Sequence, residues 1–170
     1  MDLVAPDNQY QLFMEDVRLP ADALVGQEDA AIAQLFAGLN PERIMASAFA
    51  TGLARYALDR AVAYAKERAV FGAPIGAHQA IAHPLAKIKI DLEAAKLMMQ
   101  KAAALYDAGD DWGAAEPANM AKLLAADASS EAANMAIQTH GGFGFAAEYD
   151  VERKFRETRL YQVAPISTNL

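Results

Sequence analysis

Apolar residues recur every three or four positions between residues 79 and 107, and this spacing limits the possible folds more than any other feature of the sequence. The recurring residues are Ile81, Leu85, Ile88, Leu92, Ala95, Met99 and Ala102. Alternating steps of four and three place their side chains on one face of a helix, with a repeat of about 3.5 residues. A stripe of this length needs other helices to cover it, so the pattern predicts a helical bundle.

A helix is also predicted upstream, over residues 40–68. Asn40 is a good N-cap residue, Pro41 suits the first helical position, and the carboxylate of Glu42 suits the positive end of the helix dipole. The helix should end before the Phe-Gly-Ala-Pro sequence at 71–74, because glycine and proline both interrupt helices.

Two more helices are predicted downstream, over residues 116–139 and 148–161, with a glycine-rich break at 141–144 between them. Pro84 should kink or delay the start of the helix over 79–107, because proline lacks a backbone donor. Short links between long helices are typical of an all-α, up-and-down four-helix bundle. The apolar side of the helix over 116–139 is predicted to contain Met120, Leu124, Ala128 and Met135.

Residues 10–18 alternate between apolar and polar side chains, which predicts a short β-strand. A single strand is not stable alone, so this one would need a sheet to pair with. One interpretation makes residues 1–27 the remnant of a β domain and its linker, and residues 28–170 a helical domain of a longer protein. The other makes the segment an N-terminal tail that rests on the helices.

The composition excludes several function classes. The chain has 15 Lys and Arg against 22 Asp and Glu, for a formal net charge of −7, so it should repel nucleic acids. The sequence contains no cysteine, which excludes disulfides and fits the cytoplasm. It also contains no apolar run of the ~18 residues that a membrane span requires. The histidines, His78, His83 and His140, have no metal-ligand spacing, so no metal site is predicted.

Two clusters near the C-terminus allow more than one interpretation. Residues 142–147 match the loose pattern G-x-G-x-x-A, but a helix precedes them where a dinucleotide site requires a strand. This turn either exposes backbone N–H groups to an anionic or bulky partner or simply joins two helices. The basic residues of the last helix alternate with Glu152 and Glu157, which favours a salt-bridged surface. These basic residues are Arg153, Lys154, Arg156 and Arg159.

Two longer motifs resemble the signatures of the acyl-CoA dehydrogenase family. Residues 66–79 contain Arg68, Phe71-Gly72, Ile75 and Gln79, and are similar to the pattern R-x-x-F-G-x-x-I-x-x-x-Q. Residues 138–153 contain Gln-Thr-His-Gly-Gly-Phe-Gly, then Glu-Tyr and Glu-Arg, and are similar to the second signature. The order and separation of the motifs also fit. The chain therefore resembles the C-terminal helical domain of that family.

This resemblance implies an FAD-dependent enzyme that oxidises an acyl-CoA thioester to the 2,3-enoyl-CoA and passes electrons to an electron-transfer flavoprotein. It implies a homo-oligomer, dimer or tetramer. Arg68, Phe71 and Gln79 would contact the FAD of a neighbouring subunit, with Arg68 at its pyrophosphate. Gln138 and the turn Gly141-Gly142 would form a second cradle near the adenine.

The base of this reaction is predicted from the same resemblance. Most family members carry a glutamate after the last helix, in the sequence Y-E-G-T, but Pro165 takes that position here. A minority, similar to the isovaleryl-CoA and long-chain enzymes, carries the base in a sequence like L-x-x-E-R, which residues 39–43 match. Glu42 is therefore the predicted base, and Arg43 a partner near the substrate. Alternatively, Glu42 only complements the helix dipole.

Two other functions remain open at this level. Pro165 favours a non-catalytic assembly subunit that kept the bundle and lost the chemistry, and a flavin-dependent acyl-CoA oxidase would share the same motifs. By itself, the chain is expected to be inactive, because the family builds its flavin and acyl sites partly from other domains.

Overall fold

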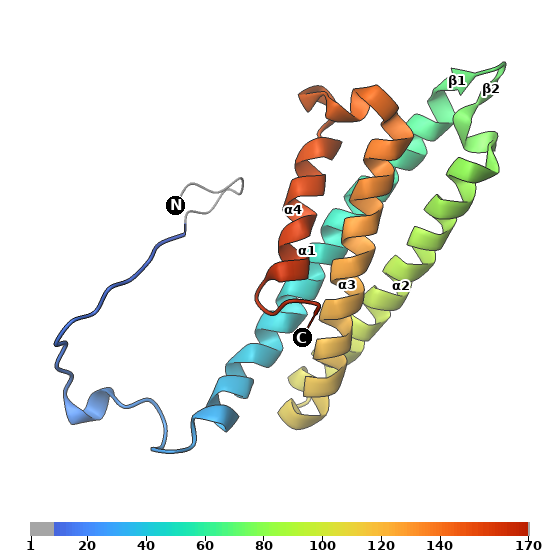
Figure 1. Ribbon diagram of the computed structural model, residues 1–170. Helices are drawn as coiled ribbons and strands as arrows, with labels where there is room; N and C mark the ends of the chain where they lie inside the picture. The colour runs from blue at the N-terminus through green and yellow to red at the C-terminus, as the bar shows by residue number, and fades with distance from the viewer. Residues whose placement is uncertain (1–8, 170) are drawn as a thin grey trace.

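Four long helices run alternately up and down in the computed structural model, which describes residues 9–169 (Figure 1). They are α1 (Ala31–Glu67), α2 (Gln79–Asp107), α3 (Asp111–His140) and α4 (Val151–Val163). The predicted all-α, up-and-down four-helix bundle is thus confirmed. A small antiparallel hairpin, β1 (Ala69–Val70) and β2 (Ala73–Pro74), joins α1 to the 3₁₀ turn η2 (Ile75–Ala77). The other 3₁₀ turns are η1 (Ala21–Ala23), η3 (Gly141–Phe145) and η4 (Ala147–Tyr149).

Alanine side chains let α3 pack closely against each of the other three helices. The buried face of α3 includes Ala114, Ala118, Ala121, Ala125, Ala128, Ala132, Met135 and Ala136. Of the predicted apolar side, Ala128 and Met135 are buried, but Met120 and Leu124 are 43% and 40% exposed. The prediction for these two residues was wrong because small side chains, not large ones, fill the narrow space between closely packed helices.

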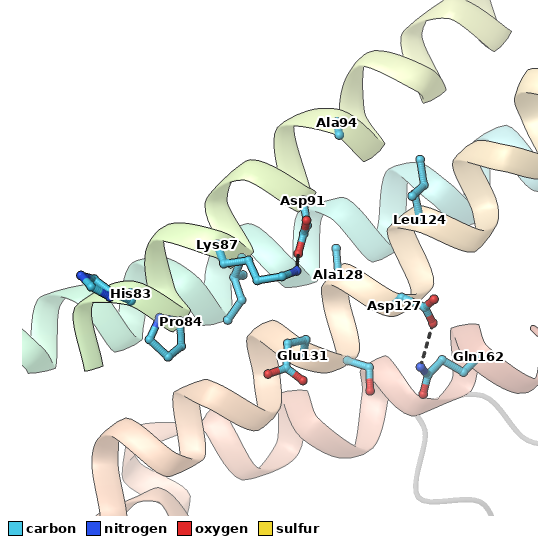
Figure 2. A pocket seen from close by; sticks show the side chains of 12 residues that line it. His83, Pro84, Lys87, Asp91, Ala94, Leu124, Asp127, Ala128, Glu131 and Gln162 are labelled. Carbon is cyan, nitrogen blue, oxygen red and sulfur yellow. Dashed lines mark hydrogen bonds and ion pairs between the residues drawn. The ribbon is translucent and has the colours of Figure 1, made fainter. Parts of the chain in front are cut away.

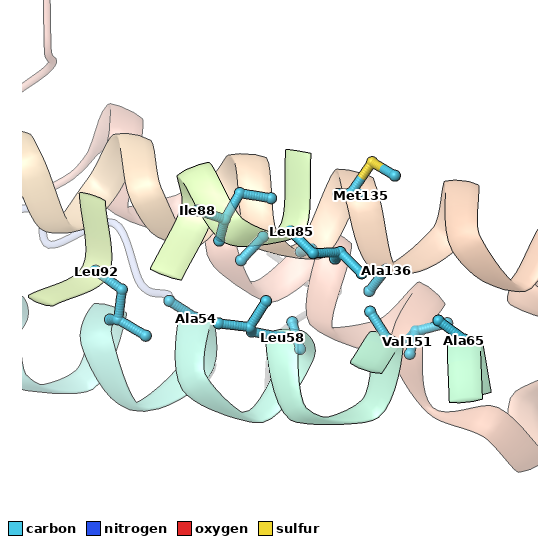
Figure 3. Packing of buried hydrophobic residues seen from close by; sticks show 13 residues of the cluster. Ala54, Leu58, Ala65, Leu85, Ile88, Leu92, Met135, Ala136 and Val151 are labelled. Carbon is cyan, nitrogen blue, oxygen red and sulfur yellow. The ribbon is translucent and has the colours of Figure 1, made fainter. Parts of the chain in front are cut away.

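The stripe of α2 forms the centre of the core (Figure 3). Leu85, Ile88 and Leu92 belong to one buried cluster with alanines of α1 and α3 and with Val151 of α4. The predicted bounds of α2 are confirmed. Pro84 does not delay the helix, which begins at Gln79 and contains Pro84 in its second turn.

Helix α1 begins at Ala31, well before the predicted start at Asn40. Residues 31–39 contain mostly good helix formers, and Pro41 lies inside the helix. Asn40 is therefore not an N-cap: it is buried, and its Nδ2 donates a hydrogen bond to the carbonyl of Asp111, 2.8 Å away. This bond ties α1 to the start of α3.

Helices α3 and α4 also differ from their predicted bounds at their first residues. Helix α3 starts earlier, at Asp111, because Asp110 caps it by accepting a 2.8 Å hydrogen bond from the N–H of Gly113. Helix α4 starts later, at Val151, because two 3₁₀ turns occupy residues 141–149. The predicted salt-bridged surface of α4 is confirmed by the ion pairs of Arg153, Lys154 and Arg156 with neighbouring acids.

Residues 10–18 do not form the predicted strand. They are exposed and lie apart from the bundle (Figure 1), so they are not a tail resting on the helices either. The physical reason is the one that the sequence already contains: a strand needs a partner for its backbone groups, and no strand of the described residues is placed to provide one.

Candidate functional site

The hairpin after α1 presents Phe71 to solvent. Phe71 and Gly72 form a two-residue loop in which both φ angles are positive, 52° and 81°, as in a type I′ turn. Positive φ suits Gly72 but strains Phe71, at a cost of about 1–3 kcal/mol. The ring of Phe71 is nevertheless 97% exposed, so no packing within the described residues offsets this strain.

Arg68 lies at the base of the hairpin, where α1 ends. Its carbonyl accepts a 2.8 Å hydrogen bond from the N–H of Ile75, which closes the hairpin. Its exposed side chain has no ion pair among the described residues. The side chain borders a cavity of about 540 Å³. The cavity is lined by Tyr64, Arg68, Val70, Ile75, Thr139, His140, Gly141, Gly142 and Phe143.

The double-glycine turn, Gly141-Gly142, also lines this cavity. Gly141 has a φ of 61° and ends α3, and a Cβ atom on Gly141 or Gly142 would meet nothing within 4 Å. No atom of the described residues therefore occupies the space beside these two glycines. Gly144 differs, because a Cβ there would lie 2.8 Å from the carbonyl oxygen of Ile137. The first two glycines leave space for a partner, whereas Gly144 lets the turn pack on α3.

Two aromatic rings that sequence analysis missed, those of Tyr64 and His140, line the cavity. The rings of Tyr64 and His140 stack with centroids 4.3 Å apart, and Tyr149 meets His140 edge-on at 5.5 Å. The Nδ1 atom of His140 lies 2.7 Å from the carbonyl oxygen of Ala136, which makes Nδ1 the protonated nitrogen. Burial lowers the pKa of His140 below its usual value, so the ring is neutral near pH 7. The stacking of residues 64 and 140 has no signal in the sequence before the helices are docked.

The structure brings together only some of the predicted cofactor residues. Arg68, Gly141 and Gly142 line the same cavity. Phe71, Gln79 and Gln138 do not line it; all three are exposed and lie near lining residues in the sequence.

The predicted base, Glu42, lies elsewhere on α1. It is exposed, and it precedes Arg68 by roughly 40 Å along the helix axis, at about 1.5 Å per residue. Because α1 begins at Ala31, Glu42 lies beyond the first turn, where the helix dipole has little effect. The alternative that Glu42 only complements the dipole therefore loses its premise.

Arg43, next to Glu42, is buried. It is only 5% exposed, its guanidinium lies 5.6 Å from the centre of the Phe36 ring, and its Nη1 atom has no hydrogen-bond partner within the described residues. Arg43 lines a second cavity, of about 340 Å³. The other lining residues are Asn119, Met120, Lys122, Leu123, Pro165, Ile166, Ser167 and Thr168.

Lys122 is the other cation of this second cavity. It is 8% exposed, and its Nζ donates a hydrogen bond to the carbonyl oxygen of Ile166. Burial lowers the pKa of the Lys122 ammonium below its usual value; Asp127 opposes this shift and Arg43 adds to it. The cavity thus joins α1, α3 and the segment after α4, and none of its lining residues is acidic.

A third cavity, of about 790 Å³, contains none of the motif residues (Figure 2). It lies between α2, α3 and α4. Lys87 forms an ion pair with Asp91, and Gln162 donates a 3.0 Å hydrogen bond to Asp127. Some polar side chains that line this cavity are therefore already paired with one another. It offers no arrangement of groups that resembles a reaction centre.

Comparison with known proteins identifies the family. The profile of the family described as acyl-CoA dehydrogenase, C-terminal domain, matches residues 32–165. The chain belongs to the acyl-CoA dehydrogenase family. Acyl-CoA dehydrogenase FadE12 of Mycobacterium tuberculosis is 62% identical over 170 residues, which are 100% of this chain and 44% of that protein.

Solved structures of acyl-CoA dehydrogenases have the same fold. The butyryl-CoA dehydrogenase of Megasphaera elsdenii matches with a TM-score of 0.83 and 33% identity, over 91% of this chain and 40% of its own. A chain from a structure of the electron transferring flavoprotein of Acidaminococcus fermentans matches with a TM-score of 0.83 and 34% identity, over 91% and 40%. The chain thus spans less than half the length of these relatives. None of the helices in residues 9–169 combines the length and apolarity that a bilayer crossing requires.

Proposed function

We propose that the intact protein is a flavin-dependent acyl-CoA dehydrogenase in which Glu42 removes the α proton of the acyl thioester. The observation that carries this proposal is the second cavity, where Arg43 and Pro165 line the same space although they are far apart in the sequence. The position where most family members carry the base therefore lies beside the helical turn that bears Glu42. Glu42, a carboxylate on α1, can therefore act as the base although position 165 is a proline.

The exposure of Glu42 fits a site completed by other parts of the protein. A base for a weakly acidic α proton must be aligned with it and shielded from water. This chain supplies the carboxylate and the buried Arg43 behind it, but nothing among the described residues covers Glu42. We infer that residues 1–27 and 28–170 belong to a β domain and a helical domain of a longer protein, and that this chain alone does not turn over substrate.

The first cavity fits FAD. The side chain of Arg68, which has no ion pair within residues 9–169, suits a diphosphate; Gly141 and Gly142 permit close approach; and the rings of Tyr64 and His140 suit contact with a flat ring. Arg68, Gly141 and Gly142 would hold the cofactor, with Phe71, Gln79 and Gln138 at its margin. When bound, FAD supplies the two-electron acceptor for the β hydride.

The separation of the two cavities supports an oligomer. Because roughly 40 Å of helix separates Glu42 from Arg68 at about 1.5 Å per residue, we infer that the two ends of one chain serve active sites completed by different copies. A homodimer or tetramer meets this requirement. An electron-transfer flavoprotein is the proposed electron acceptor, in keeping with the family.

The deciding experiment is a Glu42→Gln variant of the intact protein, mixed anaerobically with acyl-CoA while flavin bleaching is followed by stopped flow. Loss of the base should slow bleaching by about 10²–10⁴-fold while flavin stays bound. Glu116→Gln, which changes an exposed acid on α3 in the same way, is the matched control and should bleach normally. Bleaching of Glu42→Gln at the wild-type rate would remove Glu42 from the mechanism.

One observation favours a second function. Pro165 occupies the usual base position, as expected of an assembly subunit that has lost catalysis. A wild-type protein that binds FAD but is not bleached by acyl-CoA of any chain length would support this alternative.

A further inference from the structure

We propose that Lys122 is a positioning residue: it holds residues 165–168 against α3, and this segment forms the wall that places the acyl-CoA against Glu42. The inference rests on the proposed function and adds a residue that the sequence motifs do not contain. It comes from the second cavity, where the chain after α4 folds back onto the bundle.

The first support is the burial of Lys122. Removal of an ammonium group from water is unfavourable unless strong partners replace the water. No carboxylate lines this cavity, and Arg43 adds a second buried positive charge. The partner of Lys122 is instead a backbone carbonyl, that of Ile166. The hydrogen bond to Ile166 is therefore the contact that replaces water at this ammonium group.

The second support is how few contacts fix the segment. Thr168 donates a 3.0 Å backbone hydrogen bond to Gln162, and Asn169 donates one of 3.2 Å to the hydroxyl of Ser167. Both of these bonds stay within the C-terminal part of the chain. Within residues 9–169, the bond from Lys122 is the one hydrogen bond that connects residues 164–169 to another helix of the bundle. Without it, the segment has only van der Waals contacts to α3.

The third support is the position of the segment. Pro165 stands where most members of the family carry the catalytic glutamate, and it shares a cavity with the neighbour of Glu42. Here the segment cannot supply the base, but it still borders the reacting carbons under the proposed function. Its apolar side chains, together with Met120 and Leu123, suit an acyl chain. The role left to this segment is to define where the substrate lies, and Lys122 fixes it there.

The test compares Lys122→Met, which keeps the apolar stem and removes the donor, with Lys122→Arg, which keeps a charged donor. In the intact protein, Lys122→Met should raise the KM for acyl-CoA about tenfold and change kcat by less than about threefold, because a substrate wall acts mainly on binding. Lys122→Arg should recover most of the loss. Lys101→Met, which removes an exposed lysine of α2, should behave like wild type.

A second measurement does not depend on activity. Hydrogen exchange of the peptide over residues 164–169 should become about tenfold faster or more in Lys122→Met, since a charged hydrogen bond is lost, while exchange in α1 to α3 stays the same. Unchanged exchange in this peptide, or a variant whose whole bundle exchanges faster, would overturn the positioning role. Faster exchange with an unchanged KM would also overturn it. If the wild-type protein does not react with acyl-CoA, the proposed function fails, and the exchange result separates that failure from a failure of the Lys122 contact.

Discussion

The two cavities of this bundle, at Arg68 and at Arg43, differ in the residues that border them. The cavity at Arg68 is bordered by an exposed arginine, an exposed hairpin and two glycines with open space beside them. The cavity at Arg43 is bordered by two buried cations and by a segment that one of them holds in place. The first cavity is thus bordered mostly by exposed groups, whereas the second is bordered by buried cations. Under the proposed function, the end of the bundle at Arg68 would bind the cofactor and the end at Arg43 would contribute the base.

Among changes that affect only the first cavity, Arg68→Ala should weaken FAD binding the most. Loss of a charge-assisted contact to a diphosphate costs about 1.5–3 kcal/mol, which corresponds to roughly 10–100-fold weaker FAD binding. Titration of the flavin-free intact protein with FAD, followed by flavin fluorescence, measures this affinity. Bleaching of the flavin-saturated variant should remain near the wild-type rate, because Arg68 lies far from Glu42. Normal FAD affinity in this variant would mean that the first cavity binds a ligand other than FAD.

Gly144→Ala and Gly142→Ala should separate packing from ligand approach within a single turn. A Cβ on Gly144 meets the backbone of α3 at 2.8 Å, so this variant should lose about 1–3 kcal/mol of unfolding free energy. A Cβ on Gly142 meets nothing within 4 Å, so its stability should change by less than about 0.5 kcal/mol, while FAD affinity falls. Urea unfolding followed by circular dichroism, together with the same FAD titration, tests both. Equal losses of stability would contradict the division of roles between these glycines.

The sequence predicted the residues of the first cavity better than those of the second. The motifs over 66–79 and 138–144 are local, and each contains the residues that border the first cavity, so a linear pattern could find Arg68 and Gly141. The second cavity joins Arg43, Lys122 and Pro165 from three separate elements. Only Arg43 and Pro165 carried a signal, through their likeness to two alternative base positions. Lys122 had none, because its role depends on how a segment folds back after α4.

Helix boundaries show the same limit. The stripe of α2 predicted its bounds because most of its residues, Leu85, Ile88, Leu92, Ala95 and Ala102, are buried. Asn40-Pro41-Glu42 gave a convincing start signal in the wrong place, since tertiary contact overrides local capping preference: Asn40 bonds to the first residue of α3 instead. The error had a functional consequence. It made a dipole role for Glu42 look reasonable, and the true start of α1 removes that explanation.

The smallest predicted effect concerns pH and again distinguishes the two cavities. Burial, opposed by the hydrogen bond to Ala136 and aided by Arg60, lowers the pKa of His140 below its usual value. The unfolded chain therefore binds a proton more readily than the folded chain, and stability should fall as pH drops below about 6.5. Urea midpoints of this chain between pH 8 and pH 5.5 should show that decline. His140→Phe should flatten it, while His83→Gln, which changes an exposed histidine, should leave it unchanged. A decline of the same size in His140→Phe would mean that the titrating group is not His140. The pH dependence of stability would then not come from the first cavity.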